Sequence, residues 1–260
     1  MPRFCAHLGY LFTELPLEDR FAAARDAGFS AVEHPNPYPL GTTRFRDLLS
    51  STGLGCQQIA APAGDADKGE KGFACLAARQ ADFRSSLNAG LEAARIIGAP
   101  LLHIMPGILL EGESRAGCRD TYVANLMWAA NQCAEAGITG LIEPISDETV
   151  PGFYVNHPDF AAELIAEIGS ASIRMLFDLY HASVKDIDVL QFVSDHIDTI
   201  AHIQIADHPG RSEPGSGALD FTAFFALLES IDYAGYVGCE YKPSGDTAAT
   251  LGWMESYLHD

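Results

Sequence analysis

Short runs of consecutive apolar residues alternate along the whole chain with longer segments that have helical periodicity. Runs in which apolar residues follow one another without alternation are typical of parallel strands buried on both faces. Eight such runs are present. The predicted strands are Phe4–Leu8, Ala31–Glu33, Leu54–Ala60, Pro100–Met105, Thr139–Glu143, Ile173–Asp178, Thr199–Ala206 and Tyr236–Glu240.

The segments between these runs carry apolar residues at the spacing of one helix face. The three clearest stripes are Phe83-Leu87-Leu91-Ala94, Val123-Leu126-Met127-Ala130 and Phe221-Phe224-Phe225-Leu228. Asp220 stands where it would cap the first turn of the third helix. Gly28, Gly98 and Gly137 each follow a helical pattern, at the position where a left-handed residue ends a helix.

Eight β-α units in succession predict a parallel sheet, and eight is the number that closes into a (β/α)8 TIM barrel. We therefore expect one barrel domain spanning residues 1–260. A doubly wound open sheet is the alternative. It is less favoured because no G-x-G-x-x-G motif follows the first strand, and the nearest match, Gly53-Leu54-Gly55, opens a strand instead.

One irregular stretch is longer than the others and follows the third predicted strand. It covers residues 61–76 and is rich in Gly, Ala and charged residues. In a barrel this stretch would lie over the end that carries the chemistry. It is expected to be either a lid or a disordered loop.

The charge of the chain excludes some classes of partner. The formal net charge is −19 at pH 7, from 16 basic and 35 acidic side chains. Nucleic acids and anionic membrane surfaces both require a basic face, so neither is an expected partner. A small anionic substrate stays compatible with the charge, because it responds to local groups. A homo-oligomer is compatible as well.

The cysteines and the apolar segments indicate a cytoplasmic protein. Six cysteines are present, none in a C-x-x-C pair, and several lie inside apolar runs. This pattern is typical of reduced core cysteines and not of a disulfide framework. No secretory signal is expected at the N-terminus, and no apolar stretch is long enough to predict a membrane span.

Polar residues end or interrupt four successive apolar runs. They are Glu143, Asp178, Gln204 and Glu240, on predicted strands five to eight. TIM barrels keep their chemistry at the C-terminal ends of the strands, so these four side chains should share one mouth. Crowded carboxylates raise one another's pKa, and a divalent cation removes that repulsion. Oxygen-only ligands favour Mg²⁺ or Mn²⁺. A hydrogen-bonded polar plug is the alternative.

Five basic residues are candidates for contacts to a substrate. His181 follows Asp178 by three residues, and Lys242 follows Glu240 by two. Arg211 lies in a Gly/Pro-rich loop, from which a guanidinium could bind a substrate carboxylate. His103 and His7 lie on strands four and one.

Four of these basic residues also have a simpler interpretation. Arg211 could pair with Glu213 in its own loop. His181 could be a surface histidine or one that only supports a ligand, and the strand histidines could be satisfied core residues. Other chemistries are less favoured, because the chain has no G-x-S-x-G elbow, no Walker A loop and no H-E-x-x-H motif.

Taken together, these residues resemble the hydroxypyruvate isomerase family within the xylose isomerase-like barrels. The resemblance runs along nearly the whole chain. It is carried by Leu11-Phe12-Thr13-Glu14, Pro62-Ala63-Gly64-Asp65, Gly69-Glu70-Lys71-Gly72, Leu141-Ile142-Glu143-Pro144-Ile145, Pro151-Gly152-Phe153, Asp178-Leu179-Tyr180-His181, His202-Ile203-Gln204-Ile205-Ala206-Asp207, Arg211-Ser212-Glu213-Pro214-Gly215-Ser216-Gly217 and Tyr236-Val237-Gly238-Cys239-Glu240-Tyr241-Lys242-Pro243.

The resemblance implies a function for the predicted oxygen ligands. Residues matching Glu143, Asp178, Gln204 and Glu240 hold a divalent metal in that family, and the two glutamates are its acid/base pair. Related sugar 3-epimerases usually have histidine where this chain has Gln204. The implied reaction is the conversion of hydroxypyruvate to tartronate semialdehyde through an enediolate, as part of glyoxylate and carbohydrate metabolism.

Two segments depart from the family pattern and leave the substrate open. They are Glu33–Tyr38 and Gln57–Ala61, and Ala66 replaces a common Trp. A 2-oxo-tetronate isomerase and a ketose 3-epimerase are the alternatives on the same site. An endonuclease IV-like phosphodiesterase would need more histidine ligands and a basic groove. A non-catalytic binding protein would not need intact ligands.

Overall fold

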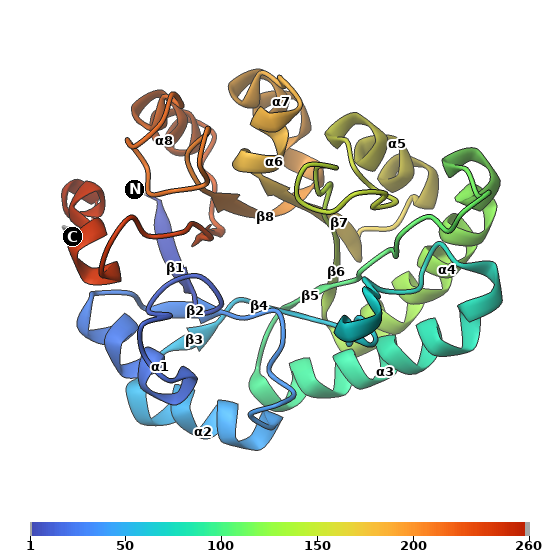
Figure 1. The fold of residues 1–260 in the computed structure, drawn as a ribbon, viewed down its shortest axis with the longest axis horizontal. Coiled ribbons are helices and arrows are strands. Elements are labelled where there is room, and N and C mark those ends of the chain that lie inside the picture. Colours follow the sequence, from blue (N-terminus) through green and yellow to red (C-terminus); the bar gives the residue numbers. More distant parts are fainter. Residues whose placement is uncertain (1, 258–260) are drawn as a thin grey trace.

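The computed structural model describes residues 2–257 and shows one parallel sheet surrounded by helices (Figure 1). The strands follow the order β3-β2-β1-β9-β8-β7-β6-β5-β4. Their bounds are β1 Arg3–His7, β2 Ala31–Glu33, β3 Gly55–Cys56, β4 Gln58–Ala60, β5 Leu101–His103, β6 Thr139–Ile142, β7 Ile173–Asp178, β8 Ile200–Ile205 and β9 Tyr236–Cys239. The predicted TIM barrel is confirmed.

The helices lie around the outside of the strands (Figure 1). Their bounds are α1 Leu17–Asp26, α2 Thr42–Thr52, α3 Gln80–Ile97, α4 Arg115–Ala136, α5 Pro158–Ile168, α6 Leu179–Val184, α7 Val189–His196 and α8 Phe221–Ser230. Short 3₁₀ turns are η1 Ala66–Lys68, η2 Ala77–Arg79, η3 Ile197–Thr199, η4 Thr247–Thr250 and η5 Gly252–Tyr257.

The third predicted strand is divided in two. β3 pairs with β2, whereas β4 pairs with β5, so the chain changes partner at Gln57. Hydrogen bonds still cross this break: Gln57 N–H donates to Val32 O at 2.9 Å, and His34 N–H donates to Gln58 O at 3.2 Å. These bonds close the barrel on this side. On the other side β1 pairs with β9, which joins the two ends of the chain.

The predicted helical stripes are buried, with one exception. Phe83, Leu87, Leu91 and Ala94 pack into the core from α3. On α4, however, Met127 is 47% exposed. The buried face of α4 centres on Tyr122, Leu126, Ala129 and Cys133, and Met127 lies around the helix from that row.

The predicted helix ends are confirmed. The Asp220 carboxylate accepts a hydrogen bond from Ala223 N–H at the start of α8. Gly98 and Gly137 are left-handed residues directly after α3 and α4. Gly28, just past α1, has a φ of 90°.

The last part of the stretch 61–76 is packed against the barrel and its exposed middle forms the turn η1, so the disordered alternative was wrong. Phe73, Ala74, Cys75 and Leu76 are buried. Gly72 pairs with Pro106 in an antiparallel bridge, and a Cβ on Gly72 would lie 2.1 Å from Met105 O. The approach of two backbones therefore requires glycine here. The role of this stretch as a lid stays a prediction.

All six cysteines are buried and unpaired, as the sequence predicted. Within residues 2–257, none of the helices combines the length and the apolar character needed to cross a bilayer.

Candidate active site

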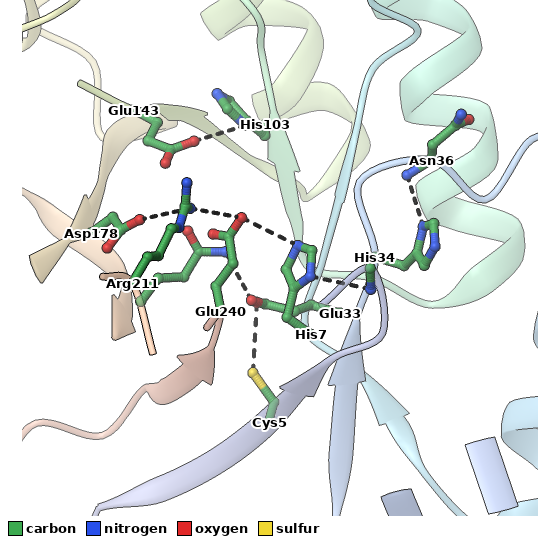
Figure 2. A network of polar contacts seen from close by, with 12 residues as sticks. Cys5, His7, Glu33, His34, Asn36, His103, Glu143, Asp178, Arg211 and Glu240 are labelled. Atoms are coloured by element: carbon green, nitrogen blue, oxygen red, sulfur yellow. Dashed lines mark hydrogen bonds and ion pairs between the residues drawn. The ribbon is translucent and has the colours of Figure 1, made fainter. Parts of the chain in front are cut away.

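The four predicted oxygen ligands lie at the C-terminal ends of neighbouring strands. Figure 2 shows three of them, Glu143, Asp178 and Glu240. Glu143 follows β6, Asp178 ends β7, Gln204 lies near the end of β8 and Glu240 follows β9. Glu143, Asp178 and Gln204 are buried, and the Glu240 side chain is only 13% exposed. The parallel pairing of β6 to β9 thus places three carboxyl groups and one carboxamide in one barrel mouth.

Arg211 lies between two of these carboxylates. Its Nη2 is 3.3 Å from Asp178 Oδ2 and 3.2 Å from Glu240 Oε1. The guanidinium carbon lies 4.8 Å from the ring centre of Tyr10 and 5.1 Å from that of Tyr180. Flanking aromatic rings favour a cation at this position. Arg211 thus lies beside the predicted ligands Asp178 and Glu240.

The simpler interpretation of Arg211 was wrong. Glu213 does not pair with it but accepts hydrogen bonds from the backbone and hydroxyl of Ser244.

A buried aspartate organises the loop that carries Arg211. Asp207 is fully buried and accepts hydrogen bonds from the backbone N–H groups of four residues. The donors are His208, Gly215, Gly217 and Leu219. Arg211 itself has a left-handed φ of 57°, and its carbonyl accepts a 2.7 Å bond from Lys242 N–H. These bonds hold the backbone of the loop from which the Arg211 side chain extends.

Lys242 lies outside the buried cluster. Its side chain is exposed, and its backbone N–H donates the hydrogen bond to Arg211 O. A substrate-binding role for its amino group stays a prediction.

Each predicted histidine contacts a predicted carboxylate. His103 Nδ1 is 3.4 Å from Glu143 Oε2, and His7 Nε2 is 3.7 Å from Glu240 Oε1. His181 Nε2 lies 3.5 Å from Asp178 Oδ2 and 3.9 Å from Glu143 Oε1. His181 is buried, so the surface interpretation was wrong.

Burial keeps these three histidines neutral near pH 7. It lowers the pKa of His7, of His103 and of His181 to about 4 in each case. Ser146 Oγ lies 3.2 Å from His181 Nδ1 and holds the ring in place. The site therefore contains imidazoles that can donate or accept hydrogen bonds without adding charge.

The carboxylates are short of positive charge. Burial, together with Glu240 and Asp178, raises the pKa of Glu143 well above its usual value. Burial also raises the pKa of Glu240 to about 8, although Arg211 opposes the shift. One guanidinium thus does not balance three buried carboxyl groups. A bound divalent cation would add the missing charge.

The side chains fit such a cation. Glu143, Asp178 and His181 each offer a ligand atom within 4.8 Å of the others. Gln204 Oε1 is buried and has no hydrogen-bond partner within residues 2–257. A set dominated by carboxylate and amide oxygens suits Mg²⁺ or Mn²⁺ better than a soft metal.

Two buried residues of this site, Glu33 and His202, were not predicted as functional. Glu33 is at the end of β2. Its Oε2 is 2.6 Å from His202 Nε2, and its Oε1 is 2.8 Å from Gln204 Nε2. Burial raises the pKa of Glu33, but the charges and hydrogen bonds of its neighbours hold it below its usual value. The sequence signal was available, since Glu33 closes the run Ala31-Val32 just as Glu143 closes β6.

Known proteins resemble this chain over nearly its full length. The family model described as "Xylose isomerase-like TIM barrel" matches residues 21–257. A 2-oxo-tetronate isomerase from Cupriavidus necator is 41% identical over 258 residues, covering 99% of both chains. The hydroxypyruvate isomerase of Escherichia coli is 36% identical over 257 residues, covering 99% of this chain and all of the relative.

A solved structure agrees with these sequence matches. The crystal structure of a protein from Brucella melitensis, described as an AP endonuclease of family 2, superposes with a TM-score of 0.96. It is 36% identical, and the match covers 99% of each chain. The chain therefore belongs to the xylose isomerase-like TIM barrel family, within its hydroxypyruvate and 2-oxo-tetronate isomerase group, and is an isomerase of small oxo acids.

Proposed function

We propose that the protein is a metal-dependent isomerase that converts hydroxypyruvate to tartronate semialdehyde. The observation that carries the proposal is the pair of carboxyl groups, Glu143 and Glu240, that rise from non-adjacent strands into one buried mouth. β7 and β8 lie between their strands. A planar intermediate held between the two carboxyl groups would have one of them on each side.

The reaction moves a carbonyl group by one carbon without net oxidation. One carboxylate removes a proton from C3 of hydroxypyruvate, and the C–H electrons form a C2–C3 double bond. As that double bond forms, the C2 carbonyl π electrons move to the C2 oxygen. The other carboxyl group delivers a proton to C2, and the proton of the C3 hydroxyl passes to the C2 oxygen, so that C3 becomes the aldehyde and C2 carries the hydroxyl. We assign these two transfers to Glu143 and Glu240. General acid–base transfers of this kind contribute about 10²–10⁴-fold to a rate.

Glu143, Asp178, Gln204 and Glu240 would hold the cation. When bound, it supplies a positive charge that stabilises negative charge on substrate oxygens. The other side chains hold the substrate: Arg211 takes its carboxylate, and His181 and His103 donate hydrogen bonds to its oxygens. The surrounding burial excludes bulk water, which strengthens each of these contacts.

Arg211→Gln is expected to raise KM for the oxo acid by about 10–100-fold, because a hydrogen bond to a charged group contributes about 1.5–3 kcal/mol. Arg211→Lys should recover part of the loss, since it keeps the charge but not the two-pronged geometry. Steady-state kinetics measure both. The exposed Arg46, paired with Asp47, gives the control Arg46→Gln. An unchanged KM in Arg211→Gln would place the substrate carboxylate elsewhere.

A four-carbon substrate, 2-oxo-tetronate, is the second candidate. A cavity of about 680 Å³ is lined in part by His103. It is lined by residues that include Pro35, Tyr38, Ala61 and Met105. Both segments that depart from the family pattern contribute to this lining. The cavity gives room beyond three carbons, and the Cupriavidus necator relative is named for the four-carbon acid.

The two candidates are separated by assaying metal-stripped protein to which Mg²⁺ or Mn²⁺ is returned. Each acid is offered in deuterated water, and proton exchange and product are followed by NMR. Turnover of hydroxypyruvate supports the proposal. Turnover of 2-oxo-tetronate alone would indicate that the fourth carbon of the substrate occupies the cavity. Absence of cation-dependent exchange with either acid would contradict both.

A further inference from the structure

Glu33 is a buried carboxylate that faces three donors and lies outside the proposed ligand set. It accepts hydrogen bonds from Gln204 Nε2 at 2.8 Å and from His202 Nε2 at 2.6 Å. The thiol of Cys5 lies 3.6 Å from its Oε2 (Figure 2). Glu33 is fully buried. A carboxylate surrounded in this way can only accept, so the group of Gln204 that faces it must be the NH₂ end.

This contact decides which end of the Gln204 amide remains free. With Nε2 bound to Glu33, Oε1 is left without a hydrogen-bond partner among the described residues, although it is buried. Buried acceptors are normally satisfied, so an unpaired one at a functional site needs an explanation. An amide oxygen is a ligand for a hard cation, whereas an amide nitrogen is not. The end of the Gln204 amide that stays free is therefore the oxygen, which can bind a cation.

The opposite orientation would otherwise be favoured. Asp178 is the register neighbour of Gln204 on β7, and Glu143 and Glu240 lie at the adjacent strand ends. Carboxylates attract the NH₂ end of an amide and repel its oxygen. Without a competing carboxylate behind it, the Gln204 side chain would turn its NH₂ group toward the site and pair with the ligands that the cation needs.

The backbone of β9 leaves space for the contact between Glu33 and Gln204 but not for a side chain at residue 238. Gly238 on β9 is the register neighbour of Gln204. A Cβ on Gly238 would lie 2.4 Å from Glu33 Oε1 and 2.9 Å from Gln204 Cγ. A side chain at residue 238 would therefore displace the contact. His202 holds the second oxygen of Glu33, so the carboxylate is fixed from two directions.

We propose that Glu33 is a positioning residue that fixes the Gln204 carboxamide with its nitrogen on Glu33 and its oxygen toward the cation. The inference rests on the metal site of the proposed function. In this proposal Glu33 is not itself a ligand of the cation and acts through Gln204. It acts by excluding the amide orientation that would place two donor hydrogens among the carboxylates.

The first test is Glu33→Gln, which keeps the size of the side chain and lets the Gln204 amide turn over. The Kd for Mn²⁺ of metal-stripped protein is measured by electron paramagnetic resonance. Loss of a residue that orients a ligand weakens metal binding by about 10–100-fold, and we expect a change in this range. Glu18→Gln is the matched control, because Glu18 is exposed and pairs with Arg44 on the surface. Its Kd should equal that of the wild type.

The second test exchanges the two groups in Glu33→Gln/Gln204→Glu. The amide introduced on β2 would then donate to the carboxylate introduced on β8 and accept from His202. The hydrogen bond between residues 33 and 204 is thus restored with its donor and acceptor exchanged. The charge of the pair is unchanged. We expect this double variant to bind Mn²⁺ within about threefold of the wild type or more tightly, reversing the loss of about 10–100-fold.

Either variant can overturn the inference. A wild-type Kd in Glu33→Gln would show that the amide needs no anchor, even if the melting temperature falls. A double variant that binds at least about tenfold more weakly than the wild type would assign the loss to something other than orientation. If Glu33→Gln does not fold, the double variant decides alone. The titration uses no substrate, so a protein that binds Mn²⁺ but isomerises no oxo acid would refute the proposed function only.

Discussion

Glu143→Gln and Glu240→Gln are each expected to lower kcat for the oxo acid about 10³-fold, the middle of the range for a lost acid or base. Gln keeps the size of the side chain and one oxygen but cannot take a proton. Both residues lie at the buried ends of strands, so the substitution should leave the barrel folded. Steady-state rates are measured at saturating Mn²⁺, with the Kd for Mn²⁺ determined separately for each variant.

Isotope exchange separates the two roles. The variant that lacks the base should no longer exchange the C3 protons of hydroxypyruvate with deuterated water. The variant that lacks the acid should still exchange them but release no product. Glu135→Gln on the exposed side of α4 is the control. Full activity with bound metal in Glu240→Gln would show that the two-carboxylate mechanism is wrong.

Removal of divalent metal is expected to reduce turnover about 10³-fold or more. Charge stabilisation by a metal contributes several kcal/mol, and each 1.36 kcal/mol is about tenfold in rate. Mg²⁺ or Mn²⁺ should restore the rate. The measurement is a chelation and reconstitution series on one preparation.

Thermal melting provides the control for metal removal. A cation that binds only the folded state stabilises it by about 2.7 kcal/mol at 100 times its Kd. Melting temperature and activity should therefore rise together as metal returns. Full turnover by protein shown to be metal-free would contradict the proposed mechanism.

The fold was predictable because a closed parallel barrel imposes a simple pattern on the sequence. Strands covered on both faces must be apolar throughout, and β2 and β7 were predicted with their observed bounds. The division of Leu54–Ala60 into two strands was not predictable from that pattern. The division depends on where the chain stops pairing with β2 and begins to pair with β5. That point is set by the closed sheet and not by the local sequence.

The shared location of the predicted site residues could be inferred where a polar residue ends or interrupts an apolar run. Glu143, Asp178, Gln204 and Glu240 follow that rule, and the structure brings them to one end of the barrel. Glu33 follows it as well, but its importance comes from a bond across the barrel to Gln204. Pairings of this kind depend on the diameter of the barrel and on side-chain reach, which a single sequence does not contain.

The pairing of β1 with β9 has a consequence for the order in which the protein is made. During synthesis β1 leaves the ribosome first and β9 last among the strands, and His7 and Glu240 can approach only after both are present. Asp178 and Gln204 also come from the later part of the chain. A nascent chain therefore carries Glu33 and Glu143 before Asp178, Gln204 and Glu240 are made, and it cannot complete the cation site until β9 has emerged. Catalytic competence and completion of the barrel should arise in one late event, as expected for a topology dominated by long-range contacts.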